Sequence, residues 1–146
     1  MPMRAKDMME TAVLTVDEDL DALSCARTMA ERRKGYALLL HGGSSISGII
    51  TEWDFLEKLV AHGRDPAAVH VREIASPTVH SCAPDAPADE VVDRMSKEGI
   101  RRVIVMSGGR PVGIITAKNV LAMFRPYIDQ LSSEIAGYHS DPTPLG

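Results

Sequence analysis

Gly48-Ile49-Ile50-Thr51 recurs further along the chain as Gly113-Ile114-Ile115-Thr116, displaced by 65 residues. Upstream of these segments, Met29 aligns with Met95 at a displacement of 66 residues. The one-residue difference falls in the Gly-rich stretch that precedes each segment, where a surface hairpin loop tolerates an insertion. The sequence therefore contains an internal repeat, and this repeat determines the fold that we expect.

Each half of the chain shows the same order of elements. An extended stretch precedes an acidic turn and a helix whose apolar residues recur at helical spacing. Two strands around a Gly turn follow, and a second helix then begins at Thr51 or at Thr116. The expected strands around the turns are residues 36–40, 46–50, 102–106 and 112–115. The order in each half is therefore strand, helix, strand, strand, helix.

Neither half is large enough to bury both faces of its own sheet. We therefore expect an α+β fold in which two pseudo-twofold-related repeats pack sheet against sheet and close one core. The expected boundaries are a first repeat over residues 1–62, a linker over 63–70, a second repeat over 71–125, and a C-terminal helix and tail over 126–146.

The segment after the second repeat predicts one more helix. Pro126 suits the first helical position, and Gly137 is expected to end the helix. Between them lies an apolar stripe made of Tyr127, Ile128, Leu131 and Ile135. The polar tail at residues 140–144 is expected to need a contact with another subunit in order to be ordered.

Composition and motifs exclude several function classes. The net charge is −4 and only 4% of residues are aromatic, whereas nucleic-acid-binding proteins show basic stripes or stacking platforms. No apolar run approaches the ~20 residues that a membrane span needs. The two cysteines and five histidines show no metal-ligand spacing, and no nucleotide loop or catalytic motif is present. We therefore expect a cytoplasmic protein that binds neither nucleic acid nor membrane, has no metal or cofactor, and is not an enzyme.

The duplicated pattern resembles the CBS domain family. The resemblance rests on a Gly-apolar-apolar-Thr-x-x-acid segment at the end of each repeat, residues 48–54 and 113–119. Lys6-Asp7-Met8-Met9 and residues 100–105 also match, and the resemblance covers about residues 4–125. It implies two-domain discs that form homodimers and bind AMP, ADP, ATP, NAD or S-adenosylmethionine in clefts between the repeats.

In similar proteins the Thr and the acid of this segment hold the ribose hydroxyls, a role that falls here on Thr51 and Asp54. A carboxylate suits the role because charge-assisted hydrogen bonds are strong. The same two residues also form a capping box at a helix start, and the two interpretations are compatible. In the second repeat Thr116 is retained, but Asn119 replaces the acid and offers one acceptor oxygen without charge. The alternative for Asn119 is a solvated residue in the first turn of a helix.

Phosphate groups need cations, and in similar proteins these come from the repeat that does not hold the ribose. Arg101 and Arg102 fit this role, and a planar guanidinium suits phosphate well. The alternative is a solvated strand end or an ion pair. Lys118 is a further phosphate candidate or a solvated helix residue. Gly35 and Tyr36 occupy the aligned positions of the first repeat. We therefore expect two unequal clefts, the second of which would combine Thr116 and Asn119 with Gly35 and Tyr36.

The adenine ring needs an apolar slot, for which Ala12, Val13 and Ile50 are candidates, although core residues give the same pattern. We expect the competent cleft to be the one that joins the ribose pair of the first repeat to the arginines of the second.

These expectations favour a homodimeric regulatory module that senses an adenosine-containing ligand and signals to an effector protein of unknown identity. Such a ligand acts through its different affinities for two arrangements of the repeats. The alternative is a ligand-free structural module that dimerises and scaffolds a partner, which the replacement at Asn119 favours in part.

Overall fold

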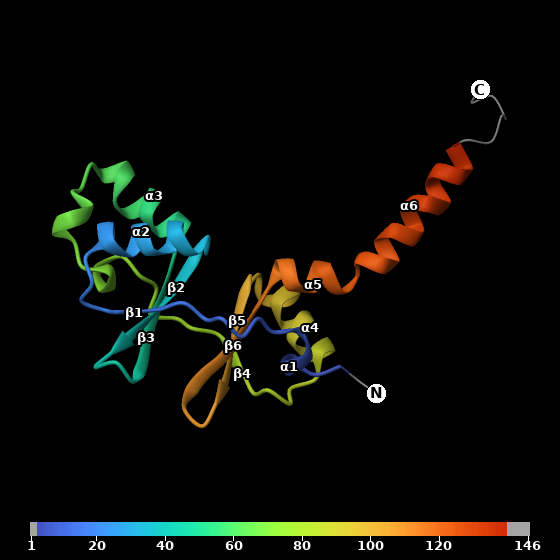
Figure 1. Cartoon of the computed structure of the whole chain (residues 1–146), viewed down its shortest axis with the longest axis horizontal. Coiled ribbons are helices and arrows are strands. Elements are labelled where there is room, and N and C mark those ends of the chain that lie inside the picture. Colours follow the sequence, from blue (N-terminus) through green and yellow to red (C-terminus); the bar gives the residue numbers. More distant parts are fainter. Residues whose placement is uncertain (1–2, 140–146) are drawn as a thin grey trace.

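The structure is a computed structural model that describes residues 3–139, so the expected tail contact at residues 140–144 lies outside the described residues. The first repeat contains β1 (Thr15–Asp17), α2 (Ala22–Arg32), β2 (Tyr36–His41), β3 (Ser45–Thr51) and α3 (Glu52–Lys58). The second repeat contains β4 (Ser81–Cys82), α4 (Ala88–Glu98), β5 (Arg102–Ser107), β6 (Arg110–Thr116) and α5 (Ala117–Met123). The expected order of elements is therefore confirmed in both repeats (Figure 1).

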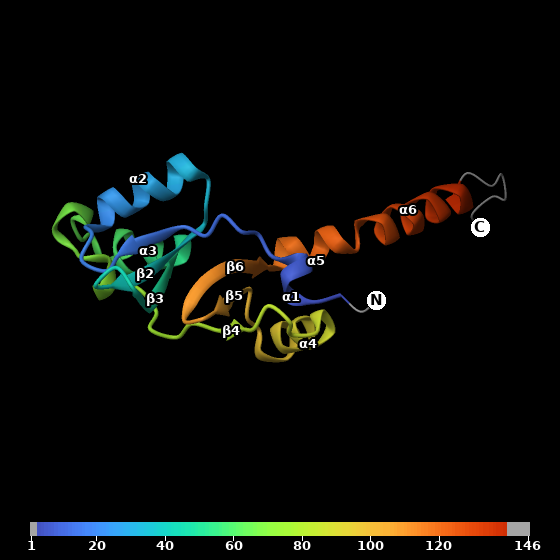
Figure 2. The same ribbon diagram turned by 60° about the horizontal axis from the view of Figure 1, so that its bottom comes forward.

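Each repeat contributes a three-stranded sheet, in the order β1-β2-β3 or β4-β5-β6. The first pair of strands in each sheet is parallel and the second pair is an antiparallel hairpin. The two sheets lie in the middle of the molecule, with the helices of each repeat on the outer side (Figures 1 and 2). The expected packing of two related α+β repeats is confirmed.

The two hairpin loops account for the one-residue slip between the repeats. His41 pairs with Ser45 across a three-residue loop, whereas Ser107 pairs with Arg110 across a two-residue loop. Two glycines in each loop have φ between 58° and 77°, a left-handed conformation that glycine adopts without steric cost. The Gly pairs are therefore turn residues, as expected.

Each repeat is completed by the segment that precedes the other repeat. The N-terminal segment carries α1 (Ala5–Met8), which packs against α4, and then crosses to the first repeat (Figure 1). On the way, Glu10 pairs with Ile114 of β6 through two backbone hydrogen bonds of 2.8 and 2.9 Å. The pseudo-symmetric pairing joins Ser76 to Ile49 of β3 through two bonds of 2.9 Å. We call the two stretches around Glu10 and Ser76 the crossing segments.

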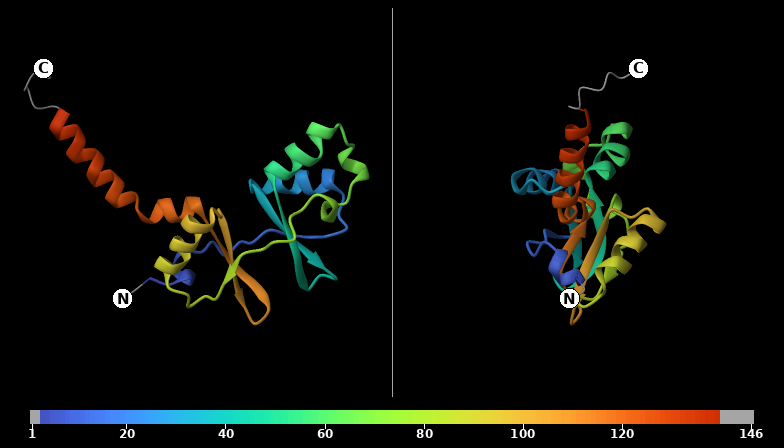
Figure 3. Two further views of the ribbon diagram at one scale, coloured as in Figure 1. Left: turned by 180° about the vertical axis from the view of Figure 1, so that it is seen from behind. Right: turned by 90° about the vertical axis from the view of Figure 1, so that its right-hand side faces the viewer.

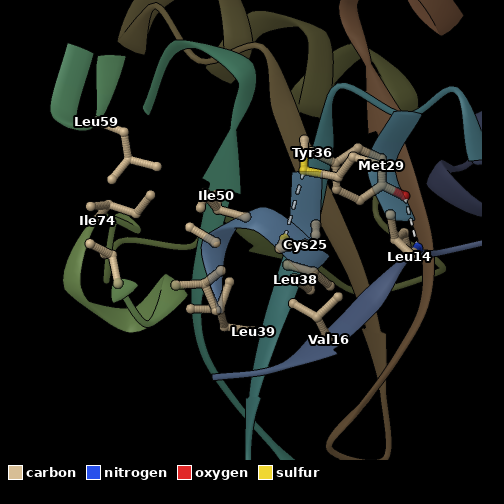
Figure 4. Packing of buried hydrophobic residues seen from close by; sticks show 14 of the residues in the cluster. Leu14, Val16, Cys25, Met29, Tyr36, Leu38, Leu39, Ile50, Leu59 and Ile74 are labelled. Carbon is tan, nitrogen blue, oxygen red and sulfur yellow. Dashed lines mark hydrogen bonds between the residues drawn. The ribbon is translucent and has the colours of Figure 1, made fainter. Parts of the chain in front are cut away.

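The buried apolar residues form two clusters rather than the single core that we expected. The larger cluster gathers around β2 and β3 (Figure 4) and includes Ile104 and Ile114 from the second repeat. The smaller cluster lies between α1, α4 and the second sheet and includes Ala5 and Met8. The cores divide because each sheet packs its own helices on one side, while the crossing segments and Ile104 and Ile114 join the halves.

The stretch expected to be a linker contributes to the core. Val69 is buried in the larger cluster, and its carbonyl accepts a 2.8 Å hydrogen bond from the amide of Ala22. Residues 60–73 form three short 3-10 turns, Val60–His62, Pro66–Ala68 and Val71–Glu73. The connection between the repeats is therefore packed structure that buries apolar side chains.

The last helix, α6 (Arg125–His139), extends away from both repeats (Figure 3). It continues past Gly137, so the expected helix end at that residue is wrong. Gly137 has no positive φ, and glycine inside a helix costs only about 1 kcal/mol relative to alanine. Gly137 therefore remains part of the helix, because its own backbone does not adopt the left-handed conformation of a helix-ending glycine.

The crossing segments explain why a glycine begins each repeated Gly-apolar-apolar-Thr segment. A Cβ atom on Gly48 would lie 2.6 Å from the carbonyl oxygen of Ser76. A Cβ atom on Gly113 would overlap the side chain of Met9 in the pseudo-symmetric place. Only a residue without a side chain allows the crossing segments to approach the last strand of the other repeat.

We predict that Gly48→Ala lowers the free energy of unfolding by about 1–3 kcal/mol, because the new methyl group must displace a backbone carbonyl. Chemical denaturation followed by circular dichroism measures this change. Ser45→Ala, at an exposed position of the same strand, is the control and should stay within about 0.5 kcal/mol of the original chain. Equal losses in both variants would contradict the role assigned to Gly48.

Candidate functional site

A cavity of about 750 Å³ opens between the repeats at the start of α3. Its walls are formed by Gly35, Thr51, Glu52, Trp53, Leu56, Arg101 and Arg102. A smaller pocket of about 160 Å³ shares Thr51 and both arginines. Its other walls are Ile49, Thr78, Val79, His80, Ile100 and Ile104. We call the two spaces together the first cleft. The structure thus brings Thr51 of the first repeat and the two arginines of the second into one cleft.

Asp54 lies behind Thr51 rather than on the wall of the first cleft. Its Oδ2 atom accepts hydrogen bonds from the Thr51 amide at 2.8 Å and from the Thr51 hydroxyl at 3.2 Å. Its Oδ1 atom is 3.1 Å from the Lys58 ammonium group, which also donates to the carbonyl of Ile74. Asp54 is only 8% exposed. In this arrangement Asp54 caps the helix and orients Thr51, so a ribose hydroxyl must share or replace one of these bonds to reach the carboxylate.

Arg102 has a buried hydrogen-bond donor without a partner. Among the residues that the structure describes, its Nε atom is one of two buried side-chain polar atoms that make no hydrogen bond. The guanidinium carbon lies 5.8 Å from the centre of the Tyr36 ring, a distance that allows a cation–π contact. A buried donor without an acceptor costs free energy. Because Arg102 also lines the cavity, an anionic group there would meet the charge of its guanidinium group.

The structure differs from the expectation that Gly35 and Tyr36 serve the other cleft. Gly35 lies on the wall of the first cleft, and Tyr36 is buried beneath Arg102. Strand pairing places Tyr36 directly opposite Thr51, and Arg102 of the second repeat covers its ring. The Tyr36 hydroxyl accepts a 3.3 Å bond from the amide of Leu14, and burial raises the pKa of this phenol.

At the place in the second repeat that is pseudo-symmetric to the first cleft, which we call the second cleft, the polar side chains bond one another. The Thr116 hydroxyl lies 2.9 Å from Asn119 Oδ1, and Asn119 Nδ2 donates a 2.8 Å bond to Glu10. The other carboxylate oxygen of Glu10 lies 3.4 Å from the Lys34 ammonium group. The bond from Asn119 lowers the pKa of Glu10 against an opposing effect of burial, and the charges of Lys34 and Lys118 lower it further.

Glu10 supplies the acid that the second repeat lacks at Asn119. Sequence reasoning missed it because Glu10 lies 109 residues from Asn119 and reaches the second repeat only through a crossing segment. Lys118, a phosphate candidate, is exposed and influences Glu10. The structure therefore does not bring Lys118 together with Arg101 and Arg102.

The structure does not bring the adenine-slot candidates into the first cleft. Ile50 is completely buried in the larger core cluster, whereas its neighbour Ile49 lines the cleft. Successive strand residues point to opposite faces, which explains the difference. Ala12 is exposed, and Val13 packs on the larger cluster.

The apolar wall of the first cleft comes instead from Thr78 and Val79, 66 residues after Ala12 and Val13. The crossing segments explain why these residues take the place of Ala12 and Val13. The segment around Ser76 pairs with the first repeat and leads directly to Thr78 and Val79 at the first cleft. By the same pseudo-symmetry, Ala12 and Val13 belong beside the second cleft.

Within the described residues we find neither a metal-binding cluster nor a helix that could span a membrane. No group of three or more His, Cys, Asp or Glu side chains within residues 3–139 is arranged to hold a metal ion. In the same range, no helix has the length and apolar character that crossing a bilayer requires.

Comparison with known proteins identifies relatives over most of the chain. The profile of the family described as CBS domain matches residues 5–61 and 71–125. The chain is 33% identical over 117 residues to an uncharacterized protein of Methanopyrus kandleri, covering 80% of this chain and 59% of that protein. It therefore spans less than two thirds of that relative. It is 28% identical over 116 residues to hypoxic response protein 1 of Mycobacterium tuberculosis, covering 80% and 81% of the two chains.

Solved structures with the same fold include ligand complexes. The CBS domain pair of protein MJ0100, in complex with 5′-methylthioadenosine and S-adenosyl-L-methionine, is 25% identical with a TM-score of 0.74, covering 84% of this chain and 99% of that chain. A hexameric CBS-CP12 protein from bloom-forming cyanobacteria is 26% identical with a TM-score of 0.74, covering 83% and 71% of the two chains. Hypoxic Response Protein I with two coordinated zinc ions is 28% identical with a TM-score of 0.71, covering 82% and 98%.

We predict that Asn119→Ala destabilises the fold more at neutral than at acidic pH. The lowered pKa of Glu10 contributes stability above its unfolded-state pKa, and this contribution is lost as the pH falls through the folded-state pKa. The pH-dependent part should be about 0.5–1 kcal/mol, because the pair is partly exposed. Chemical denaturation at pH 7 and well below the ordinary carboxyl pKa of about 4.3 measures it.

A second background separates this effect from helix capping, because Asn119 also accepts a bond from the Thr116 amide. In a Glu10→Gln chain, Asn119→Ala should cost the same free energy at both pH values. A pH-dependent loss that persists in that background would contradict the assignment to Glu10.

Proposed function

The chain belongs to the CBS domain family as a tandem pair, and on this basis we propose that its first cleft binds an adenosine-containing ligand whose binding regulates a partner protein. Tandem CBS pairs are regulatory modules that bind adenosine ligands, and proteins made only of CBS domains are generally not catalytic. The ligand classes to consider are AMP, ADP, ATP, NAD and S-adenosylmethionine.

The observation that carries the proposal is that Arg101 and Arg102 of the second repeat line one cavity together with Thr51 of the first. A phosphate oxygen would accept from the guanidinium group, and hydrogen bonds between charged groups are the strong ones. Arg101 is exposed on the same wall and adds a second cation. Glu52 places one acid there as well, which limits the excess of positive charge. The wall therefore favours a ligand with few phosphates over a highly charged one.

The remaining parts of the ligand find suitable groups in the same cleft. The Thr51 hydroxyl lies at the wall, with the Asp54 carboxylate bonded to it from behind. A ribose hydroxyl would replace the Thr51 hydroxyl as the donor to the Asp54 carboxylate, or would share that acceptor with it. Val79 and Ile100 provide the apolar surface that an adenine ring needs. Ribose, base and phosphate therefore each have a chemically matched group in the first cleft.

We expect one ligand for each chain rather than two. In the second cleft the acid is Glu10, and it is already bonded to Asn119 and paired with Lys34. A phosphate placed there would meet a carboxylate, and like charges repel strongly in a partly buried site. The crossing segment beside the first cleft carries no acid, because Ser76 occupies the position pseudo-symmetric to Glu10, and the Glu52 carboxylate there is outnumbered by two arginines.

The second candidate function is a ligand-free scaffold that dimerises and holds a partner. It is favoured by the closed network of the second cleft, and by Asp54, whose two carboxylate oxygens already have partners. In either function we propose a homodimer, because oligomers occur among similar proteins. The two candidates differ in one measurable property, which is ligand binding at the first cleft.

We predict that at least one of AMP, ADP, ATP, NAD and S-adenosylmethionine raises the melting temperature of the protein. A ligand at 100 times its dissociation constant adds about 2.7 kcal/mol of stability. Differential scanning fluorimetry measures the shift, and isothermal titration calorimetry should give one site for each chain. The absence of any shift with all five compounds would favour the scaffold.

We predict that Arg102→Gln weakens binding of a phosphate-containing ligand roughly 10- to 100-fold, through the loss of about 1.5–3 kcal/mol from a charged hydrogen bond. Arg110→Gln, on the exposed turn of β6, is the matched control and should change affinity little. Calorimetric titration of both variants measures the difference. A similar loss with both variants would point to general charge attraction rather than to the first cleft.

We predict that Asp54→Asn and Asn119→Ala differ in their effect on ligand binding. Asp54→Asn keeps an acceptor for the Thr51 amide but removes the charge, so it should abolish most of the ligand-induced shift in melting temperature. Asn119→Ala, in the second cleft, should retain most of the shift. The reverse pattern would move the ligand to the second cleft.

A further inference from the structure

The last helix has no buried face. Every residue from Phe124 to Gly137 is exposed. Figures 1 and 3 show α6 leaving the end of α5 and projecting away from both sheets. A helix of about 15 residues without tertiary contacts is only marginally stable in water. Packing against something outside its own chain would therefore stabilise α6 substantially.

The exposed apolar residues of this segment follow a heptad spacing. Phe124 lies between α5 and α6, and Ile128, Leu131 and Ile135 lie in α6. They are separated by four, three and four residues, the alternation of the a and d positions of a coiled coil. The exposed fraction of each is between 46% and 56%. In this register Ile128 and Ile135 occupy a positions, and Phe124 and Leu131 occupy d positions. We call these four residues the α6 seam.

We infer that α6 pairs in parallel with α6 of a second copy of this chain, as a short two-stranded coiled coil. β-Branched residues at a combined with leucine at d favour two parallel strands. Both a positions of the seam are isoleucine, and the d position between them is leucine. The spacing alone also suits a helix that docks in a groove, so the choice of a second copy rests on the residue types at a and d.

The residues beside the seam are compatible with self-pairing. The flanking e and g positions are Arg125, Tyr127, Ser132 and Glu134, so two copies would not bring rows of like charges together. The opposite face carries Asp129 and Ser133 and stays polar. Gln130 supports the helix from the side through a 3.3 Å hydrogen bond to Glu134. One face is therefore suited to a second helix and the other to water.

The seam is shorter than two heptads, with three of its four residues in α6, and interfaces burying less than about 1,200 Å² are usually weak. It therefore adds to contacts between the two bodies of a homodimer and orients them, with both chains leaving the pair at the same end. The inference deepens the proposed homodimer but does not depend on ligand binding. Its test is consequently independent of the test of the first cleft.

The test uses cysteine cross-linking of the full chain. In a parallel pair, equal a positions face each other, so Ile135→Cys should give a disulfide-linked dimer on a non-reducing gel after mild oxidation. Ser133→Cys, on the outer face of the same helix, is the matched control. The original chain provides the background, since Cys25 is buried and Cys82 is partly buried. Cross-linking of Ile135→Cys no greater than that of Ser133→Cys would overturn the inference.

Two further variants test the orientation and the role of the seam. A mixture of Phe124→Cys and differently sized Ile135→Cys chains should cross-link mainly 124 to 124 and 135 to 135. Because a positions face d positions in an antiparallel pair, predominant 124-to-135 products would show antiparallel helices and overturn the parallel arrangement. Adding Leu131→Glu to Ile135→Cys should reduce the dimer band at least tenfold, whereas adding Ser133→Glu should not. Both charge variants should leave any ligand-induced melting shift unchanged, because α6 lies outside the first cleft.

Discussion

The pairing of each crossing segment with the last strand of the other repeat is the interaction on which the structure depends. Four backbone hydrogen bonds, two at Glu10 and two at Ser76, fix these segments in place. They require glycine at position 48, where a Cβ atom would lie 2.6 Å from the carbonyl oxygen of Ser76, and at position 113 a Cβ atom would overlap the side chain of Met9. They also determine which residues line the clefts. Thr78 and Val79 follow Ser76 in the sequence and line the same pocket as Thr51.

Pseudo-symmetry makes the two clefts alike in backbone and different in charge. In the first, Asp54 pairs with Lys58 behind Thr51, and the arginines of the second repeat line the front. In the second, the acid lies on the crossing segment as Glu10, and Asn119 has become its hydrogen-bond donor. The carboxylate is thus on a helix in the first repeat, as Asp54, and on the crossing segment beside the second repeat, as Glu10. The first cleft therefore presents the cationic groups of Arg101 and Arg102. In the second cleft, the polar groups of Thr116, Asn119 and Glu10 are bonded to one another.

Much of the fold follows from the sequence because duplication, turn glycines and helical spacing are all local signals. The same alignment of the repeats brought Thr51, Arg101 and Arg102 to one cleft, since a pseudo-twofold axis relates the ends of β3 and β6. Glu10 and Val79 could not be found in this way, because their place depends on which repeat each connecting segment joins. The prediction for Ile50 was wrong for a local reason. Neighbouring residues of a strand face opposite sides, so Ile49 lines the cleft whereas Ile50 lies in the core.

The packed connection at Val69 has a consequence for how the chain can be divided. A protease that cuts the exposed stretch at residues 63–65 would leave an N-terminal piece that still carries α1, which belongs to the second domain's core. The C-terminal piece would still carry Val71 and Ile74, which belong to the first domain's core. The two pieces would therefore remain associated through both core clusters. Expressed alone, either piece would expose apolar surface that is buried in the whole chain. A boundary drawn between the two units along the sequence is not a boundary in space.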